Sequence, residues 1–224
     1  MTRIIAFDVN ETLLDLSVLD EVFASVFGDA SLKGQWFAQM LQLSFVGGLT
    51  GEYVDFSAAQ TAAFLMLAER ADVPVTSDDA ARMTDKMNTL PAHPEVRSSL
   101  ELLRDTPLTV VALVNSLQRV GEAQLTHAGI RDCFDAVISA DEVQRLKPAR
   151  EAYELVASAY ETDVADVRLV AAHSWDISGA LAAGCKAAFV RRPGMVLSPL
   201  GRQPGIIATD IADVVAQIID VDLP

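Results

Sequence analysis

The stretch Ile4-Ile5-Ala6-Phe7-Asp8-Val9-Asn10-Glu11-Thr12-Leu13-Leu14-Asp15 decides how the rest of the chain is interpreted. Its apolar start has the length and composition of a buried strand. In a parallel α/β sheet, reactive groups collect beyond the carboxyl ends of the strands, and this strand ends at Asp8. Asn10 and Thr12 follow closely enough to hold its carboxylate. Two interpretations stay open from this stretch alone: Asp8 is a nucleophile that is esterified and freed by water, or it caps a turn.

The pattern of apolar residues divides the chain into two parts. The first part is helical, with helices expected at 16–27, 35–46, 52–70 and 77–88 and with Gly47-Gly48 ending the second of them. In the second part, strands alternate with helices, and the expected strands are 108–114, 136–139, 168–172, 186–190 and 206–208. That alternation is typical of a parallel sheet with helices on both faces. We therefore expect an α/β core domain of residues 1–15 and 91–224, with a helical domain of residues 16–90 inserted after the first strand.

The composition limits the class of protein. With 224 residues, 51% hydrophobic and 21% charged, the chain can bury a sizeable core. No apolar run approaches the ~20 residues that span a bilayer, and no cleavage site follows Met1-Thr2-Arg3, so we expect a cytoplasmic protein with no membrane partner. The net charge of −14 argues against a nucleic-acid partner, because phosphate contacts need clustered Lys and Arg. Cys133 and Cys185 form no metal-binding spacing.

Polar residues follow apolar segments at four places in the chain. These are Asp8 with Asn10 and Thr12, Asn115 with Ser116, Lys147 before Pro148, and His173-Ser174-Trp175-Asp176. Because parallel strands bring their carboxyl ends to one edge of a sheet, we expect these groups to meet. Each has an ordinary alternative: Asn115 could lie in a turn, Lys147 on the surface, and Asp176 at the N-cap of a helix. Together they favour a site, since a buried lysine or carboxylate is costly unless it is paired.

The four segments, in this order, resemble the motifs of the haloacid dehalogenase superfamily and, in detail, its type II 2-haloacid dehalogenase branch. The matching segments are Phe7–Leu13, Leu113–Ser116, Arg145–Pro148 and Ala172–Ala180, with Pro91–Val96 at the return from the helical part. The resemblance covers nearly the whole chain. It implies a Rossmann-like core with a helical cap domain and a hydrolase that displaces halide from a small 2-haloalkanoic acid through an aspartyl ester. It also implies that no cofactor is needed and that the protein is a homodimer formed through cap contacts.

The resemblance implies a role for each motif residue. Asp8 would displace the halide, and Lys147 would neutralise Asp8 and the developing charge, with a structural ion pair as its alternative. Asp176 would activate the water that hydrolyses the ester, and Thr12 would hold the Asp8 carboxylate. The expected contacts to a small anionic substrate are Asn10, Asn115, Tyr153, His173, Trp175 and Phe37. For Tyr153, a place in the core is an equally open alternative.

Several positions depart from the dehalogenase pattern. Val114 has no hydroxyl to donate to the substrate carboxylate, Ala171 replaces a serine, and Phe37 stands at the position of the halide-binding arginine. His173 stands where many relatives have asparagine, and it is therefore a candidate donor to the halide or the carboxylate. These departures reshape the expected pocket while the nucleophile, the lysine and the final aspartate are kept.

Two alternatives to a dehalogenase follow from the same comparison. Phosphatases of this superfamily carry a second Asp two residues after the nucleophile, here Asn10, and an acidic metal ligand five residues before the final Asp, here Ala171. Mg²⁺ prefers carboxylate oxygens, so we predict no metal ligands, and Mg²⁺ is expected as a cofactor only in the phosphatase alternative. The third hypothesis is a catalytically silent, dehalogenase-like binding protein. The altered pocket favours it, and the intact nucleophile, lysine and final aspartate oppose it.

Overall fold

The computed structural model describes residues 3–223, and the chain forms two compact units. Met1–Asp15 with Pro91–Pro224 makes up the first, which we call the α/β unit, and Leu16–Leu90 makes up the second, the helical unit. Residues 1, 2 and 224, which belong to the predicted core domain, lie outside the described residues. The chain leaves the α/β unit after β1 and returns at Pro91, where the Asp15 N–H donates to the Pro91 carbonyl at 2.8 Å. The outgoing and returning segments are thereby held side by side.

A six-stranded parallel sheet forms the centre of the α/β unit, in the order β3-β2-β1-β4-β5-β6. Its strands are β1 Ile4–Phe7, β2 Thr109–Val114, β3 Ala136–Ser139, β4 Val167–Ala171, β5 Lys186–Val190 and β6 Ile206–Ala208. Phe7 at the end of β1 pairs with Ala112 of β2 on one side and Val170 of β4 on the other. The strand order reverses at β1, and in such sheets ligands bind beyond the strand ends at the reversal. Asp8 is the first residue after β1.

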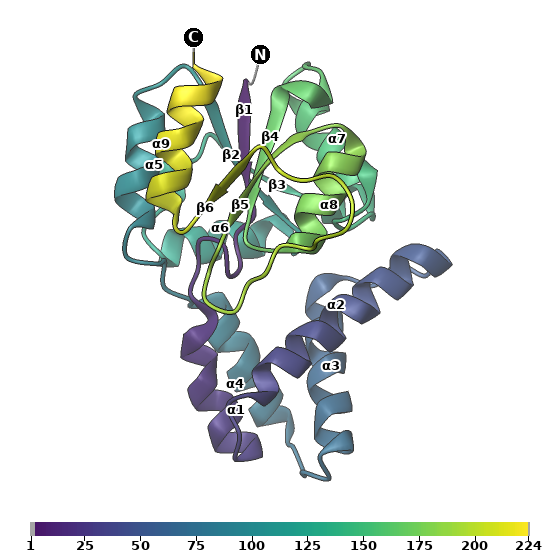
Figure 1. The fold of residues 1–224 in the computed structure, drawn as a ribbon. Coiled ribbons are helices and arrows are strands. Elements are labelled where there is room, and N and C mark those ends of the chain that lie inside the picture. The colour runs from purple at the N-terminus through teal and green to yellow at the C-terminus, as the bar shows by residue number, and fades with distance from the viewer. Residues whose placement is uncertain (1–2, 224) are drawn as a thin grey trace. The chain divides into compact units, whose positions relative to one another are not determined.

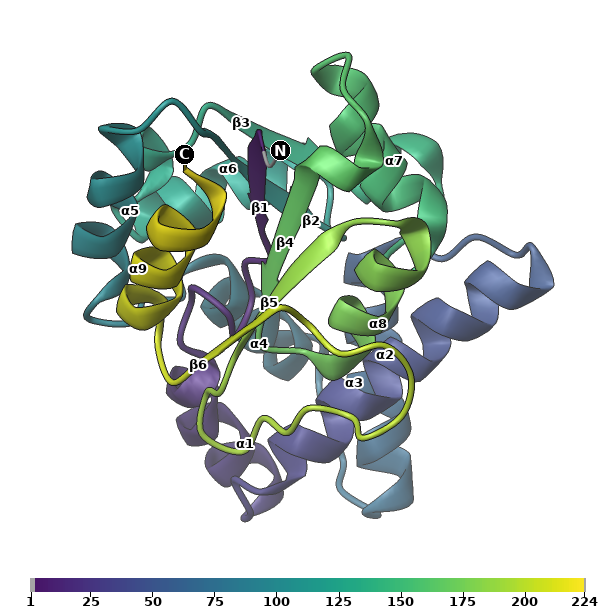
Figure 2. The same ribbon diagram turned by 45° about the horizontal axis from the view of Figure 1, so that its top comes forward.

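Helices cover both faces of the sheet. In both views α5 and α9 lie on one side and α7 and α8 on the other (Figure 1, Figure 2). The helices of this unit are α5 Val96–Arg104, α6 Gln118–His127, α7 Arg150–Ala159, α8 Ser174–Ala183 and α9 Ile211–Asp222. Beneath α7 and α8, the buried residues Val156 and Ile177 pack with Leu169 of β4 in one apolar cluster. The β strands are buried because both faces are covered, which explains their continuous apolar runs.

The helical unit is built around aromatic side chains. Its elements are the 3₁₀ turn η1 Leu16–Leu19, α1 Asp20–Phe27, α2 Leu32–Thr50, α3 Phe56–Arg70 and α4 Ser77–Asn88. The ring of Phe23 lies 5.5 Å from that of Trp36 and 6.0 Å from that of Phe64, between ring centres. The buried Trp36 indole donates to the Gln60 carbonyl at 3.0 Å, so its polar atom is satisfied.

The start of α3 and the end of α2 each lie four residues beyond the expected position. Helix α3 begins at Phe56 and not at residue 52, because the Asp55 carboxylate accepts the N–H groups of Ser57 and Ala58 and caps the helix there. Helix α2 passes through Gly47 and ends before Gly51, whose φ of 79° is the left-handed conformation of a helix end. A glycine inside a helix costs only about 1 kcal/mol, so Gly47 does not end α2. A side chain would not fit at this position, since a Cβ at position 47 would lie 2.7 Å from the Glu52 carbonyl oxygen.

Candidate active site

The carboxylate of Asp8 lies at the carboxyl end of β1 and is held by three side chains. Its Oδ2 accepts the Thr12 hydroxyl at 2.6 Å and lies 3.1 Å from His173 Nδ1, and its Oδ1 accepts Lys147 Nζ at 2.8 Å. Burial would raise the pKa of Asp8, but the charge of Lys147 and the hydrogen bond with His173 outweigh it. They hold the pKa of this carboxyl well below its usual range. Asp8 is therefore an anion at neutral pH.

Lys147 is the cation between two carboxylates. Only 1% of this residue is exposed, and its Nζ lies 2.8 Å from both Asp8 Oδ1 and Asp176 Oδ2. Burial opposes the charge, yet the two carboxylates raise the pKa of Lys147 above its ordinary value, so it stays an ammonium. Asn115 holds the backbone at this point, because its Oδ1 accepts the Lys147 N–H at 2.8 Å and its Nδ2 donates to the Lys147 carbonyl at 3.3 Å.

Asp176 lies in the first turn of α8 and is fully buried. The Tyr153 hydroxyl donates to its Oδ1 at 2.6 Å, while Oδ2 accepts Lys147. Burial and the nearby charge of Asp8 raise the pKa of Asp176 despite the attraction of Lys147. Two neighbouring carboxylates thus have pKa values moved in opposite directions, which separates a permanent anion from a candidate base. The N-cap interpretation of Asp176 is wrong, because α8 begins at Ser174 with His173 at the N-cap position.

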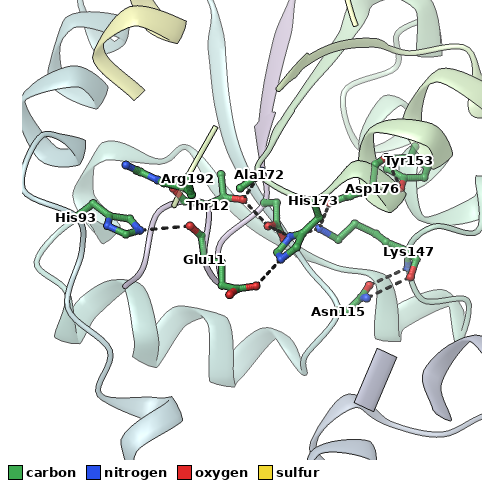
Figure 3. A network of polar contacts seen from close by, with 11 residues as sticks. Glu11, Thr12, His93, Asn115, Lys147, Tyr153, Ala172, His173, Asp176 and Arg192 are labelled. Carbon is green, nitrogen blue, oxygen red and sulfur yellow. Dashed lines mark hydrogen bonds and ion pairs between the residues drawn. The ribbon is translucent and has the colours of Figure 1, made fainter. Parts of the chain in front are cut away.

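His173 lies between the carboxylates of Asp8 and Glu11, and Glu11 was not among the site residues predicted from the sequence. Its Nδ1 faces Asp8, and its Nε2 lies 2.8 Å from Glu11 Oε2 (Figure 3). Burial opposes charge on the imidazole, but the hydrogen bonds to Asp8 and Glu11 outweigh it and raise the pKa of His173 to about 10. The Trp175 ring stacks on the imidazole at 5.2 Å between centres and lies 6.0 Å from Lys147 Nζ. His173 is therefore an imidazolium at neutral pH.

The turn that carries Glu11 and Thr12 is fixed by residues from distant segments (Figure 3). Arg192, after β5, donates to the Thr12 carbonyl at 3.1 and 2.9 Å and to the Glu95 carboxylate at 2.7 Å. His93 Nε2 lies 3.3 Å from the Glu11 carbonyl oxygen. These contacts hold Glu11 at a φ of 62°, a left-handed conformation that costs a non-glycine residue about 1–3 kcal/mol. The only sequence signal for Glu11 was its place inside the nucleophile motif.

Two other predicted substrate contacts have local partners of their own. Asn10 turns toward α6, where its Oδ1 accepts Gln124 Nε2 at 3.2 Å. Phe37 lies on α2 of the helical unit, partly exposed, with its ring centre 6.1 Å from that of Trp36. The remaining predicted residues meet around Asp8, Lys147 and Asp176, as the convergence of the strand ends required.

The side chains around Asp8 do not fit a divalent metal ion. Within residues 3–223, no three His, Cys, Asp or Glu side chains are grouped so that they could hold one. Asp8 faces the cations Lys147 and His173, position 171 is an alanine, and the Asn10 oxygen already accepts Gln124. Mg²⁺ requires several oxygen ligands, and a third cation beside Lys147 and His173 would be repelled.

A buried, ionised aspartate at the reversal of a parallel sheet, beside a lysine shared with a second carboxylate, is an arrangement typical of hydrolases that work through an aspartyl intermediate. The sequence model of the haloacid dehalogenase-like hydrolases matches residues 5–190. The chain belongs to this family. No helix in the described part of the chain has the length and apolarity to cross a membrane.

Characterised relatives resemble the chain over nearly its full length. The (S)-2-haloacid dehalogenase of Pseudomonas sp. (strain YL) is 29% identical over 215 residues, covering 94% of this chain and 92% of that protein. The haloacetate dehalogenase H-2 of Moraxella sp. (strain B) is 27% identical, covering 97% of each. Among solved structures, the L-2-haloacid dehalogenase RSc1362 superposes with a TM-score of 0.92 at 25% identity, covering 97% and 98% of the two chains. The L-2-haloacid dehalogenase of Xanthobacter autotrophicus with chloropropionic acid covalently bound has the same fold, with a TM-score of 0.90 at 22% identity and 99% of each chain covered.

Gly179 on α8 is a position where added volume should disturb this cluster. A Cβ there would lie 2.5 Å from both the Tyr153 hydroxyl and Pro148 Cβ. We expect Gly179→Ala to lower the free energy of unfolding by about 1–3 kcal/mol through overpacking and to reduce activity, since Tyr153 and the Lys147–Pro148 segment must move. Chemical denaturation and enzyme assays would measure both effects. Gly34→Ala is the matched control, since nothing lies within 4 Å of its Cβ, and an equal loss in both variants would contradict the prediction.

Proposed function

We propose that the protein is a hydrolytic dehalogenase that displaces halide from a small 2-haloalkanoic acid through an Asp8 ester and needs no cofactor. The observation that carries the proposal is the buried Asp8 carboxylate, kept ionised by Lys147 and placed beside a second carboxylate of raised pKa. The names of the relatives, an (S)-2-haloacid dehalogenase and a haloacetate dehalogenase, support the same substrate class.

In the first half-reaction, Asp8 attacks the carbon that bears the halogen. A new bond forms between a carboxylate oxygen and that carbon, and the halide leaves with the electron pair of the broken bond. Burial of Asp8 away from water strengthens it as a nucleophile, because a hydrated carboxylate must first shed its water. Lys147 neutralises the site, so that an anionic substrate can approach the Asp8 anion, and Thr12 fixes the orientation of the carboxylate.

In the second half-reaction, water hydrolyses the ester. Asp176 takes a proton from the water that attacks Asp8 Cγ, and its raised pKa makes it a stronger base than an ordinary aspartate. Tyr153 and Lys147 orient Asp176 through its two oxygens. The products are a 2-hydroxy acid, the regenerated Asp8 carboxylate and one proton released to solvent.

A substrate panel tests the proposal. We expect chloro-, bromo- and fluoroacetate and the two enantiomers of 2-chloropropionate to include substrates that yield halide and 2-hydroxy acid in equal amounts. The rate should be unchanged by EDTA and by added Mg²⁺. Mg²⁺-dependent hydrolysis of a phosphate ester panel, without halide release, would replace the proposal with a phosphatase. A negative result for both panels would favour a catalytically silent protein.

We also propose that the helical unit serves as a cap over the site, with Phe37 and Trp175 among the substrate contacts, and that the protein is a cytoplasmic homodimer. The insertion of Leu16–Leu90 directly after β1 supports the cap, because closure of an inserted unit would exclude water from the reaction. Light scattering of the full chain tests the dimer, and a monomer at micromolar concentration would contradict it.

A further inference from the structure

The two oxygens of the Asp8 carboxylate differ in the donors they accept. Oδ2 has the Thr12 hydroxyl at 2.6 Å and the His173 imidazolium at 3.1 Å, whereas Oδ1 has the Lys147 ammonium at 2.8 Å. A carboxylate oxygen has two lone-pair sites. Both sites of Oδ2 are therefore occupied, and Oδ1 keeps one for the attack on carbon. This assignment makes Oδ1 the ester oxygen and Oδ2 the carbonyl oxygen of the ester.

We propose that His173 is a catalytic residue of ester hydrolysis, donating with Thr12 to the oxyanion that forms at Asp8 Oδ2, and that Glu11 is its positioning residue. The inference rests on the proposed function and extends it to a group that the dehalogenase mechanism above does not use. The two donors approach one oxygen, as in the oxyanion holes of acyl-transfer enzymes.

Ester hydrolysis proceeds through a tetrahedral intermediate at Asp8 Cγ. The water oxygen bonds to Asp8 Cγ, the π pair of the carbonyl moves to Oδ2, and one water proton moves to Asp176. His173 and Thr12 donate to the negative Oδ2 and keep their protons. The pair then returns, the Cγ–Oδ1 bond breaks, and the departing alkoxide takes the proton from Asp176. The regenerated carboxylic acid of Asp8 loses its proton to solvent.

Glu11 matters most after Asp8 has been alkylated. The charged groups near His173 are Asp8 and Glu11 from the turn after β1, Lys147 from the segment before α7, and Asp176 from α8. Esterification removes the charge of Asp8. Of the two carboxylates bonded to His173, only Glu11 is then left to hold the imidazole protonated and aimed at Oδ2. A neutral imidazole would offer a weaker donor to the oxyanion.

The inference predicts a specific pH dependence. His173 acts as a cation, and its pKa is raised to about 10 in the free enzyme, where Asp8 and Glu11 both favour its protonated form. In the ester, the charge of Asp8 is gone and the pKa of His173 falls, so ester hydrolysis, measured in kcat, should be intact at lower pH and be lost as pH rises through a value below 10. Glu11→Gln removes the remaining carboxylate and should move the kcat limb lower still.

The test measures halide release and ester hydrolysis separately in the variants His173→Ala and Glu11→Gln. Glu122→Gln is the control, because Glu122 pairs with Arg131 on the surface of α6. We expect a rapid halide burst of one equivalent per active site in both site variants. Ester hydrolysis should then be slower by about 10²- to 10³-fold in His173→Ala, the usual effect of removing one oxyanion donor. The ester should be visible by intact mass as Asp8 plus the alkyl group. In Glu11→Gln, the slowing should grow with pH.

The protonation of His173 provides a readout independent of turnover. The chain has three histidines, so ¹⁵N-detected NMR with the His173→Ala variant assigns each ring. We expect both ring nitrogens of His173 to carry protons at pH 8 and the titration midpoint to fall in Glu11→Gln. A neutral His173 at pH 8, or wild-type rates of ester hydrolysis in both variants, would overturn the inference and leave the dehalogenase proposal standing. Absence of halide release by the wild-type enzyme would instead overturn the proposed function and this role with it.

Discussion

Replacing Asp8 with asparagine is expected to abolish halide release. Asparagine keeps the shape of the side chain and can still accept the Thr12 hydroxyl, but a neutral amide oxygen is a poor nucleophile toward carbon. We expect kcat/KM to fall by about 10⁴- to 10⁶-fold, the range seen when a nucleophile is removed from other hydrolases. A halide electrode and 2-hydroxy acid quantification measure the loss.

Isotope labelling shows whether the loss reflects a covalent role. A single turnover of the wild-type enzyme in H₂¹⁸O should place ¹⁸O in the Asp8 carboxylate, because water attacks Cγ and not the substrate carbon. Trypsin would release this residue in the peptide Ile4–Lys33, which fragmentation can resolve to Asp8. Asp213→Asn, an exposed carboxylate on α9, serves as the matched control and should keep full activity. Label found only in the hydroxy acid, or halide release within tenfold of wild type in Asp8→Asn, would contradict the role.

The sequence was sufficient to predict how the site is assembled. An uninterrupted apolar run identifies a strand buried on both faces, and the alternation of strands with helices requires a parallel sheet. In such a sheet the residues after β1 and β4 must meet, and Asp8 does lie 3.1 Å from His173 between Oδ2 and Nδ1. Lys147 was placed there because a buried lysine needs a carboxylate partner and because Arg145–Pro148 resembles the third motif of the superfamily.

The contacts that orient the site could not be predicted in this way. Glu11 reaches His173 only because the turn holds it at a positive φ, and the sequence pattern does not reveal that angle. Arg192 fixes the same turn across 180 positions of sequence, with its guanidinium on the Thr12 carbonyl. Some helix ends were predicted wrongly because capping residues such as Asp55 determine where a helix begins. The spacing of apolar residues carries no information about such caps.

Replacing Lys147 with methionine is expected to remove both activity and much of the stability of the α/β unit. Methionine has a similar length and no charge, so Asp8 and Asp176 lose the cation that they share. Asp8 keeps His173, whereas Asp176 is left with the Tyr153 hydroxyl. Leaving a buried charge without its partner costs about 3–5 kcal/mol. Chemical denaturation of the full chain at pH 8 measures the loss in the free energy of unfolding.

The pH dependence of that loss distinguishes the ion pair from simple repacking. Without Lys147, burial and the charge of Asp8 would raise the pKa of Asp176 further, so that this carboxyl destabilises the folded state at high pH and is relieved when protonated. The difference from wild type should therefore be largest near pH 8 and shrink as pH falls toward 5. Lys33→Met removes a partly exposed pair with Asp20 and a hydrogen bond to the Leu16 carbonyl, and it should cost about 1 kcal/mol. A loss in Lys147→Met that stays constant between pH 8 and 5 would show that packing, and not the shared charge, accounts for the stability.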